Sequence, residues 1–197
     1  MIFNLREAWV VLPGFIVGLT VHEFAHAFSA SLLGDRYAQS KGRLTLNPLA
    51  HLSPLGTILI LFLGFGYARP VPVNIYNFRN PRRDFLITSL AGPFSNIVLM
   101  FMFIAAFRLL PINNETTAMV VFLAAYANGI LALINLLPIP PLDGSRIWPF
   151  LFPGVKLSGG KLSWIWIILL LLAIRLDVLN GMFETVLNVV SRLAGLG

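Results

Sequence analysis

The stretch VVLPGFIVGLTV (Val10–Val21) contains no charged residue, and HEFAH (His22–His26) follows it directly. Both lie within a longer apolar segment, Ala8–Leu33, which is long enough to cross the roughly 30 Å hydrocarbon core of a bilayer as a helix. Ionisable side chains are costly at that depth and tend to mark functional sites. This stretch therefore indicates both a membrane fold and a candidate site within it.

The composition of the whole chain agrees with this interpretation. Of its 197 residues, 57% are hydrophobic and 11% are charged, and the mean hydropathy is +0.83. Soluble domains are about 45–50% apolar and about 25% charged. We expect a single integral-membrane domain over residues 1–197. With no cysteine in the chain, histidine and carboxylate side chains are the candidates for a transition-metal site.

Three further segments are long enough to span a bilayer: Phe85–Leu110, Thr117–Leu137 and Leu162–Leu179. The N-terminal flank of Ala8–Leu33 lacks a basic region and a cleavage site, which predicts a retained helix and not a signal peptide. The shorter run Leu55–Phe65 is interrupted by proline and glycine, which favours a re-entrant segment. The sequence thus predicts an all-α membrane protein, a bundle of about four transmembrane helices plus a re-entrant segment.

Two smaller elements complete the predicted fold. RLTLN (Arg43–Asn47) alternates polar and apolar residues, and RPVPVNIY (Arg69–Tyr76) has prolines that suit an edge strand. Together they predict a small cytoplasmic β element. The segment Met182–Leu196 has apolar residues on one helical face and polar residues on the other, which favours a C-terminal amphipathic helix on the membrane over a fifth span.

The basic residues predict the orientation of the chain. The positive-inside rule assigns the loops that are rich in Lys and Arg to the cytoplasm. With a re-entrant Leu55–Phe65, ten of these residues fall on one side: Arg36, Lys41, Arg43, Arg69, Arg79, Arg82, Arg83, Arg146, Lys156 and Lys161. The net charge of +6 is therefore expected from cytoplasmic loops, and no nucleic-acid partner is expected.

HEFAH has the H-E-x-x-H pattern of zinc hydrolases. His22 and His26 are four residues apart, so both imidazoles project from one face of a helix and can bind a single ion. Glu23 is rotated by roughly 100° from His22, beside that face, where it can contact a water molecule. The alternative is that the histidines only form hydrogen bonds between helices or line a proton or ion path.

A third ligand is expected from NLLPIPPLDGSR (Asn135–Arg146). Its three prolines cannot continue a helix, so the backbone must unwind at the membrane boundary. Unwound backbone is tolerated there only within protein or beside a water-filled cavity. Asp143 on such a segment can turn back towards the histidines, although the Asp-Gly pair also suits an ordinary turn.

Three further polar residues are weaker candidates. Asn96 lies within a predicted span, in AGPFSN, and Asn135 lies two turns before Asp143. Either can donate to a substrate carbonyl, or pack and form hydrogen bonds between helices. His51, in NPLAHLSPLG, is a ligand or gate in one interpretation and a structural loop histidine in the favoured one.

The motifs HEFAHAF, GRLTLNPLAHLSPLG, RPVPVNIYNFRNPRRD, AGPFSN and NLLPIPPLDGSR occur in this order between about Val11 and Phe150. In this combination the chain resembles the site-2 protease family of intramembrane zinc metalloproteases, in particular small microbial members without a PDZ or CBS domain. The resemblance implies that His22, His26 and Asp143 bind one zinc ion (Zn²⁺) and that Glu23 is the catalytic glutamate. It also implies that Asn96 and Asn135 contact the substrate or the transition state.

The expected function is that of an intramembrane zinc endopeptidase. It would hydrolyse peptide bonds within or near transmembrane segments of membrane-protein substrates, in the cell membrane, from a site that opens towards the cytoplasm. The alternative is a metal or proton transporter that uses the same His/Glu/Asp cluster, although the sequence has no internal repeat and few spans for one. A catalytically inactive relative is a third possibility. The sequence indicates neither the substrate nor the oligomeric state.

Overall fold

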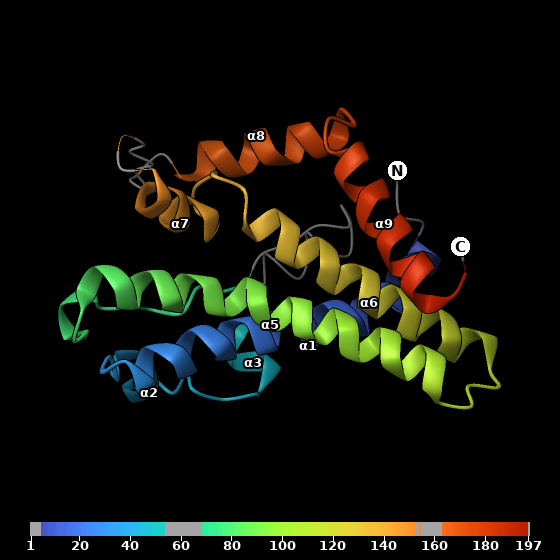
Figure 1. Cartoon of the computed structure of the whole chain (residues 1–197), viewed down its shortest axis with the longest axis horizontal. Helices are drawn as coiled ribbons and strands as arrows, with labels where there is room; N and C mark the ends of the chain where they lie inside the picture. The colour runs from blue at the N-terminus through green and yellow to red at the C-terminus, as the bar shows by residue number, and fades with distance from the viewer. Residues whose placement is uncertain (1–4, 54–67, 153, 155–162, 197) are drawn as a thin grey trace.

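Three long helices pack against one another in the computed structural model, which describes residues 5–53, 68–152, 154 and 163–196 (Figure 1). They are α1 (Leu5–Leu32), α5 (Pro81–Leu109) and α6 (Glu115–Asn135), and each contacts the other two. Their bounds lie within about four residues of the predicted spans. Each is long and apolar enough to cross a membrane, in agreement with the predicted all-α membrane protein.

The C-terminal part differs from the predicted straight span followed by a surface helix. Helix α8 (Ser163–Arg175) has 13 residues, too few to span alone. It is followed by α9 (Asn180–Ala194) at an angle of 69°, and the pair counts as a fourth span only if both are taken together. Helix α9 is amphipathic as predicted, and it packs against α5 and α6 (Figure 1).

Small residues allow α1 and α6 to approach each other closely. A Cβ atom at Gly14 would lie 2.5 Å from the Cβ of Ala124, and one at Gly18 would lie 2.8 Å from Oδ1 of Asn128. Membrane helices associate largely through such close packing and through interhelical hydrogen bonds, because lipid tails provide no hydrophobic drive between them. The contact brings the HEFAH turn of α1 next to α6.

The ends of α6 follow from local chemistry. At its start, the side chain of Asn114 accepts a hydrogen bond from the backbone N–H of Thr117 at 3.0 Å, which caps the first turn. At its end, the prolines that follow Asn135 prevent the helix from continuing, as predicted. The chain then unwinds and enters the short helix α7 (Gly144–Leu151).

The predicted cytoplasmic β element is wrong for the residues that the structure describes. Arg43–Asn47 forms no strand, and the only β pairing in the described ranges is a bridge between Leu52 and Ala68. The short helices α2 (Tyr37–Ser40) and α3 (Pro48–His51) and the 3₁₀ turn η1 (Ile75–Asn77) flank these stretches. The predicted re-entrant run Leu55–Phe65 lies outside the described residues.

Residues 68–74 form an extended segment, here called the strap, which among the described residues pairs with backbone only at its start, at Leu52 and His51, and is held by side chains beyond it. The guanidinium group of Arg43 donates to the carbonyl oxygens of Arg69 and Pro70. The buried carboxylate of Asp35 accepts a hydrogen bond from the backbone N–H of Asn74 at 2.7 Å. Pro70 and Pro72 have no N–H to donate to a neighbouring strand. These side-chain contacts therefore take the place of the backbone hydrogen bonds of the predicted β element.

Candidate metal centre

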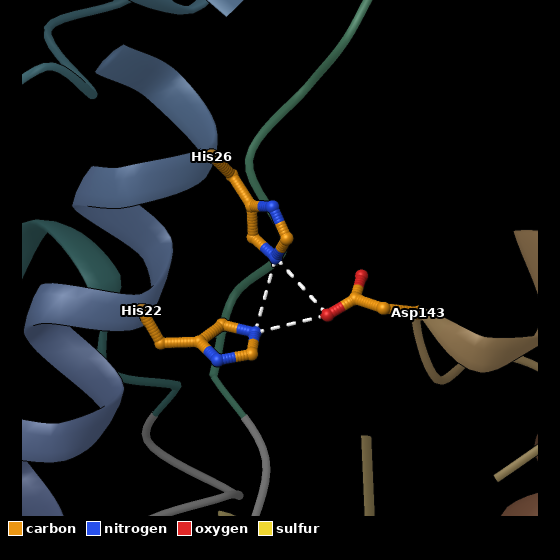
Figure 2. Close-up of side chains that lie close together, drawn as sticks. All are labelled: His22, His26 and Asp143. Atoms are coloured by element: carbon orange, nitrogen blue, oxygen red, sulfur yellow. Dashed lines mark hydrogen bonds and ion pairs between the residues drawn. The ribbon is translucent and has the colours of Figure 1, made fainter. Parts of the chain in front are cut away.

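Two histidines of α1 and the aspartate at the start of α7 converge on one point (Figure 2). The Nε2 atoms of His22 and His26 are 3.0 Å apart, and each lies 3.1 Å from Oδ2 of Asp143. All three residues are buried. Three potential ligand atoms this close to one another could hold a metal ion, as the sequence predicted.

The hydrogen bonds on the other side of each ring indicate a cation site. Nδ1 of His26 lies 2.7 Å from the carbonyl oxygen of Thr88, and Nδ1 of His22 lies 2.6 Å from Oδ1 of Asn96. Both partners are acceptors, so each Nδ1 carries a proton, and each ring in its neutral form has its lone pair on Nε2. When both rings are neutral, two lone pairs and the Asp143 carboxylate face one another. Two imidazoles and a carboxylate are a ligand set of catalytic zinc sites, and Nδ1–H bonds of this kind orient zinc-binding histidines.

Gly92 on α5 makes room for the two rings. A Cβ atom at this position would lie 2.6 Å from Nε2 of His22 and would collide with Nε2 of His26. The AGP sequence of the predicted span therefore places backbone, and no side chain, against the candidate metal centre.

Asp143 reaches the histidines because the chain folds back tightly after α6. Gly144 packs so closely against the carbonyl groups of Leu136 and Leu137 that a side chain there would collide with them. The second carboxylate oxygen of Asp143, Oδ1, lies 3.8 Å from Nη1 of Arg146. Asp143 thus belongs both to a turn and to the cluster, so the two alternatives from the sequence are compatible.

Glu23 lies beside the cluster and contacts the strap. Its Oε2 atom accepts a hydrogen bond from the backbone N–H of Val71 at 2.9 Å. The guanidinium of Arg43 is buried nearby; burial lowers its pKa, and the negative charge of Glu23 opposes that effect. The strap therefore fixes the orientation of the glutamate from one side.

Comparison with known proteins also points to a metalloprotease. The sequence model that describes peptidase family M50 matches residues 111–175 of this chain. YwhC of Bacillus subtilis, named as a candidate zinc metalloprotease, is 47% identical over 155 residues, which cover 72% of this chain and 68% of YwhC. The chain belongs to peptidase family M50.

Two less similar relatives match in the same way. Rip2 of Mycobacterium tuberculosis is 36% identical over 184 residues, covering 88% of this chain and 70% of Rip2. MJ0611 of Methanocaldococcus jannaschii is 33% identical over 148 residues, which cover 72% of this chain and 73% of MJ0611. Both are also named as candidate zinc metalloproteases, and no solved structure gives a significant match. The resemblance to the site-2 protease family is thus confirmed, and this M50 peptidase is a metalloprotease of the membrane.

A cavity of about 230 Å³ opens onto the candidate metal centre of this M50 peptidase. His22, Glu23, His26 and Asp143 line it together with Asn135 and Arg146, and most of its remaining wall is apolar. The apolar part comes from α1, α6, the strap and the α8–α9 pair: Val11, Phe15, Leu19, Ala127, Ile130, Leu131, Ile134, Val71, Val73, Ile174 and Phe183. A peptide segment with hydrophobic side chains suits such a cavity.

The weaker candidates of the sequence lie in three different places. Asn135 lines the cavity, with its amide donating to the carbonyl of Leu131 at 2.8 Å. Asn96 is fully buried on the Nδ1 side of His22 and is not presented to the cavity, so its substrate contact stays a prediction. His51 is fully buried in α3, with Nε2 2.7 Å from the carbonyl oxygen of Thr45, and is not part of the cluster.

Sequence reasoning did not identify Asn128, Arg43 or the N–H of Val71 as parts of this site. Asn128 could have been found, because an asparagine in the middle of an apolar span needs a partner. The other two depend on where the strap lies, and no motif in the sequence indicates that position.

Proposed function

We propose that this chain is an intramembrane zinc endopeptidase that hydrolyses peptide bonds within or next to transmembrane segments of membrane-protein substrates. His22, His26 and Asp143 hold one zinc ion, and Glu23 is the general base. The observation that carries the proposal is the burial of the three-ligand group at the polar end of an otherwise apolar cavity, with both histidines inside a helix that can span a membrane.

The ligands and the glutamate have separate tasks. When bound, zinc acts as a Lewis acid that polarises a carbonyl group and lowers the pKa of water. The bond to Val71 occupies Oε2 of Glu23, so we assign proton transfer to Oε1. Glu23 takes a proton from the water that attacks the scissile carbonyl carbon. It then delivers this proton to the nitrogen of the leaving amine as the C–N bond breaks.

The strap is the proposed docking edge for the substrate. A helical substrate must unwind, because its carbonyl groups are hydrogen-bonded and its side chains shield the backbone. An unwound segment can recover hydrogen bonds by pairing with an exposed extended edge. In an extended chain the backbone groups of Val71 and Val73 point to the same side, and both residues line the cavity. Asn135, which also lines the cavity, would donate to a substrate carbonyl.

The cytoplasmic side of the cell membrane is the proposed source of water. His26 lies six residues before Leu32, the last residue of α1, so roughly 9 Å from the end of the helix. The loops that follow α1 and precede α5 are basic, which favours a cytoplasmic location for this end of the bundle. The unwound backbone between Asn135 and Asp143 lies beside the cavity and provides the polar entrance that hydrolysis needs.

The test is cleavage of a model transmembrane substrate by the purified full chain in detergent with zinc. We expect the wild type to cut the substrate. Glu23→Gln should abolish cleavage while the zinc content of the protein stays at the wild-type level, because Glu23 is not among the three ligands. A wild-type protein that binds zinc but cuts no membrane substrate, and instead moves metal into liposomes, would contradict the proposal and favour the transporter.

A further inference from the structure

Two buried asparagines connect the metal centre to the backbone of α1 and α6. Asn96 of α5 and Asn128 of α6 are both fully buried. Oδ1 of Asn96 lies 2.6 Å from Nδ1 of His22, and its Nδ2 donates to the carbonyl of Gly18 at 3.1 Å and to Oδ1 of Asn128 at 3.0 Å. Burying a side-chain amide is costly unless it is hydrogen-bonded, and here the amides form one continuous line.

The orientation of Asn128 is set by groups that can only accept a hydrogen bond. Its Nδ2 donates to the backbone carbonyls of Ala124 at 2.8 Å and of Gly14 at 3.4 Å. A carbonyl oxygen has no proton to give. The nitrogen of Asn128 must therefore face Gly14 and Ala124, and its oxygen must face Asn96.

This orientation is passed on to His22. Oδ1 of Asn128 and the carbonyl of Gly18 occupy both N–H groups of Asn96, so the amide of Asn96 cannot rotate by 180° without losing them. Its oxygen consequently faces His22. An amide oxygen only accepts, so Nδ1 of His22 carries a proton, and in the neutral ring the lone pair is then on Nε2, which points to the cluster.

We propose that Asn128 is a positioning residue, which acts through Asn96 to fix the tautomer and the ring orientation of His22 for zinc binding. The inference rests on the proposed function, because it assumes that His22 binds zinc. The two histidines are oriented by different hydrogen-bond partners. His26 depends on the backbone carbonyl of Thr88, whereas His22 depends on two side chains that substitution can remove.

The test is the zinc affinity of the full chain in detergent, measured by competition with a chromogenic chelator. Partners that orient metal-binding histidines typically contribute about 10- to 100-fold in metal affinity. We expect Asn128→Ala to weaken zinc binding by about tenfold. Asn128→Leu, which keeps a side chain of similar size but has no acceptor, should lose as much. The matched control is Ser95→Ala on α5, because the Ser95 hydroxyl donates only within its own helix, to Gly92.

A double-mutant cycle tests whether Asn128 acts through Asn96. We expect Asn96→Ala to weaken zinc binding at least as much as Asn128→Ala, and the second substitution to add little in the Asn96→Ala background. Wild-type affinity in Asn128→Leu would indicate a packing role and would overturn the inference. The inference would also be overturned if Asn128→Ala weakened zinc binding equally in the wild-type and the Asn96→Ala backgrounds. The same holds if Asn128→Ala lowered the melting temperature of the zinc-free protein but left its zinc affinity unchanged.

A measurement on the wild type needs no variant to fold. The chain has three histidines, so ¹⁵N-histidine NMR of the zinc-free protein can identify the tautomer of each neutral ring. We expect the proton of His22 on Nδ1, and a neutral ring with its proton on Nε2 would overturn the inference. None of these measurements requires cleavage. A chain that binds zinc with this dependence on Asn128 but cuts nothing would contradict the proposed function alone.

Discussion

The backbone N–H of Val71 donates to Oε2 of Glu23 at 2.9 Å, across 48 positions of sequence. The proposed general base and the proposed docking edge are thus parts of one arrangement. The strap is held at its other contacts by Arg43 and Asp35, so changes at these anchors should alter catalysis without touching a metal ligand.

Arg43→Ala should slow cleavage while zinc binding stays normal. The substitution leaves the carbonyls of Arg69 and Pro70 without their charged donor, and hydrogen bonds to charged groups contribute about 1.5–3 kcal/mol. If this loss is expressed fully in the transition state, kcat/KM falls roughly 10- to 150-fold. Arg43→Lys keeps the charge and should recover part of the rate. Wild-type kcat/KM in Arg43→Ala, measured with a transmembrane substrate, would show that the strap needs no such anchor.

Val73→Pro should weaken substrate binding, because it removes the backbone N–H that the docking hypothesis assigns to strand pairing. The matched control is Val73→Thr, which keeps the β-branched shape and the N–H. We expect KM to rise about tenfold or more for the proline variant, the equivalent of about one hydrogen bond, and to change little for the threonine variant. Equal kinetics of both variants would refute docking at the strap.

Gly92→Ala should disrupt the metal centre, because the added methyl group occupies the space of both imidazoles. Overpacking of this kind costs about 1–3 kcal/mol, and here the rings must move away from Gly92, which disturbs their positions in the cluster. We expect loss of bound zinc by metal analysis and loss of cleavage. Gly181→Ala on α9 is the control, since a methyl group there meets no neighbouring atom within 4 Å. Full zinc content in Gly92→Ala would contradict the packing argument.

Asp143→Ala, His22→Ala and His26→Ala should each reduce the zinc content of the purified protein and abolish cleavage, because a catalytic zinc site needs three protein ligands. His51→Gln is the matched control, because it replaces the one histidine of the chain that we do not assign to the metal site. It should lower the melting temperature through the lost bond to Thr45 and leave zinc content unchanged. Zinc loss in His51→Gln without a change in stability would place His51 in the metal site.

The sequence was informative where chemistry is local. Four-residue spacing placed His22 and His26 on one helical face, and the proline-rich break after Asn135 predicted the return of Asp143. The three long helices were predicted within a few residues by their apolar length. Each of these features depends on a short stretch of chain and on the thickness of a bilayer.

The sequence failed where partners are distant. Alternation in Arg43–Asn47 predicted a strand, but the Arg43 side chain is instead buried against the strap, and no periodicity encodes that contact. The role of Asn96 behind His22 depends on Asn128, which lies 32 positions away on another helix. The 69° bend between α8 and α9 falls beside Arg175 and Asp177, two charged residues that the predicted span Leu162–Leu179 included.

The separation of the ligands along the chain has a consequence for biosynthesis. Asp143 leaves the ribosome 117 residues after His26, when α1, α5 and α6 have already been translated. Until then a nascent chain has only the histidine pair. The proposed three-ligand centre, and with it the proposed proteolytic activity, therefore arises only after most of the bundle has been made.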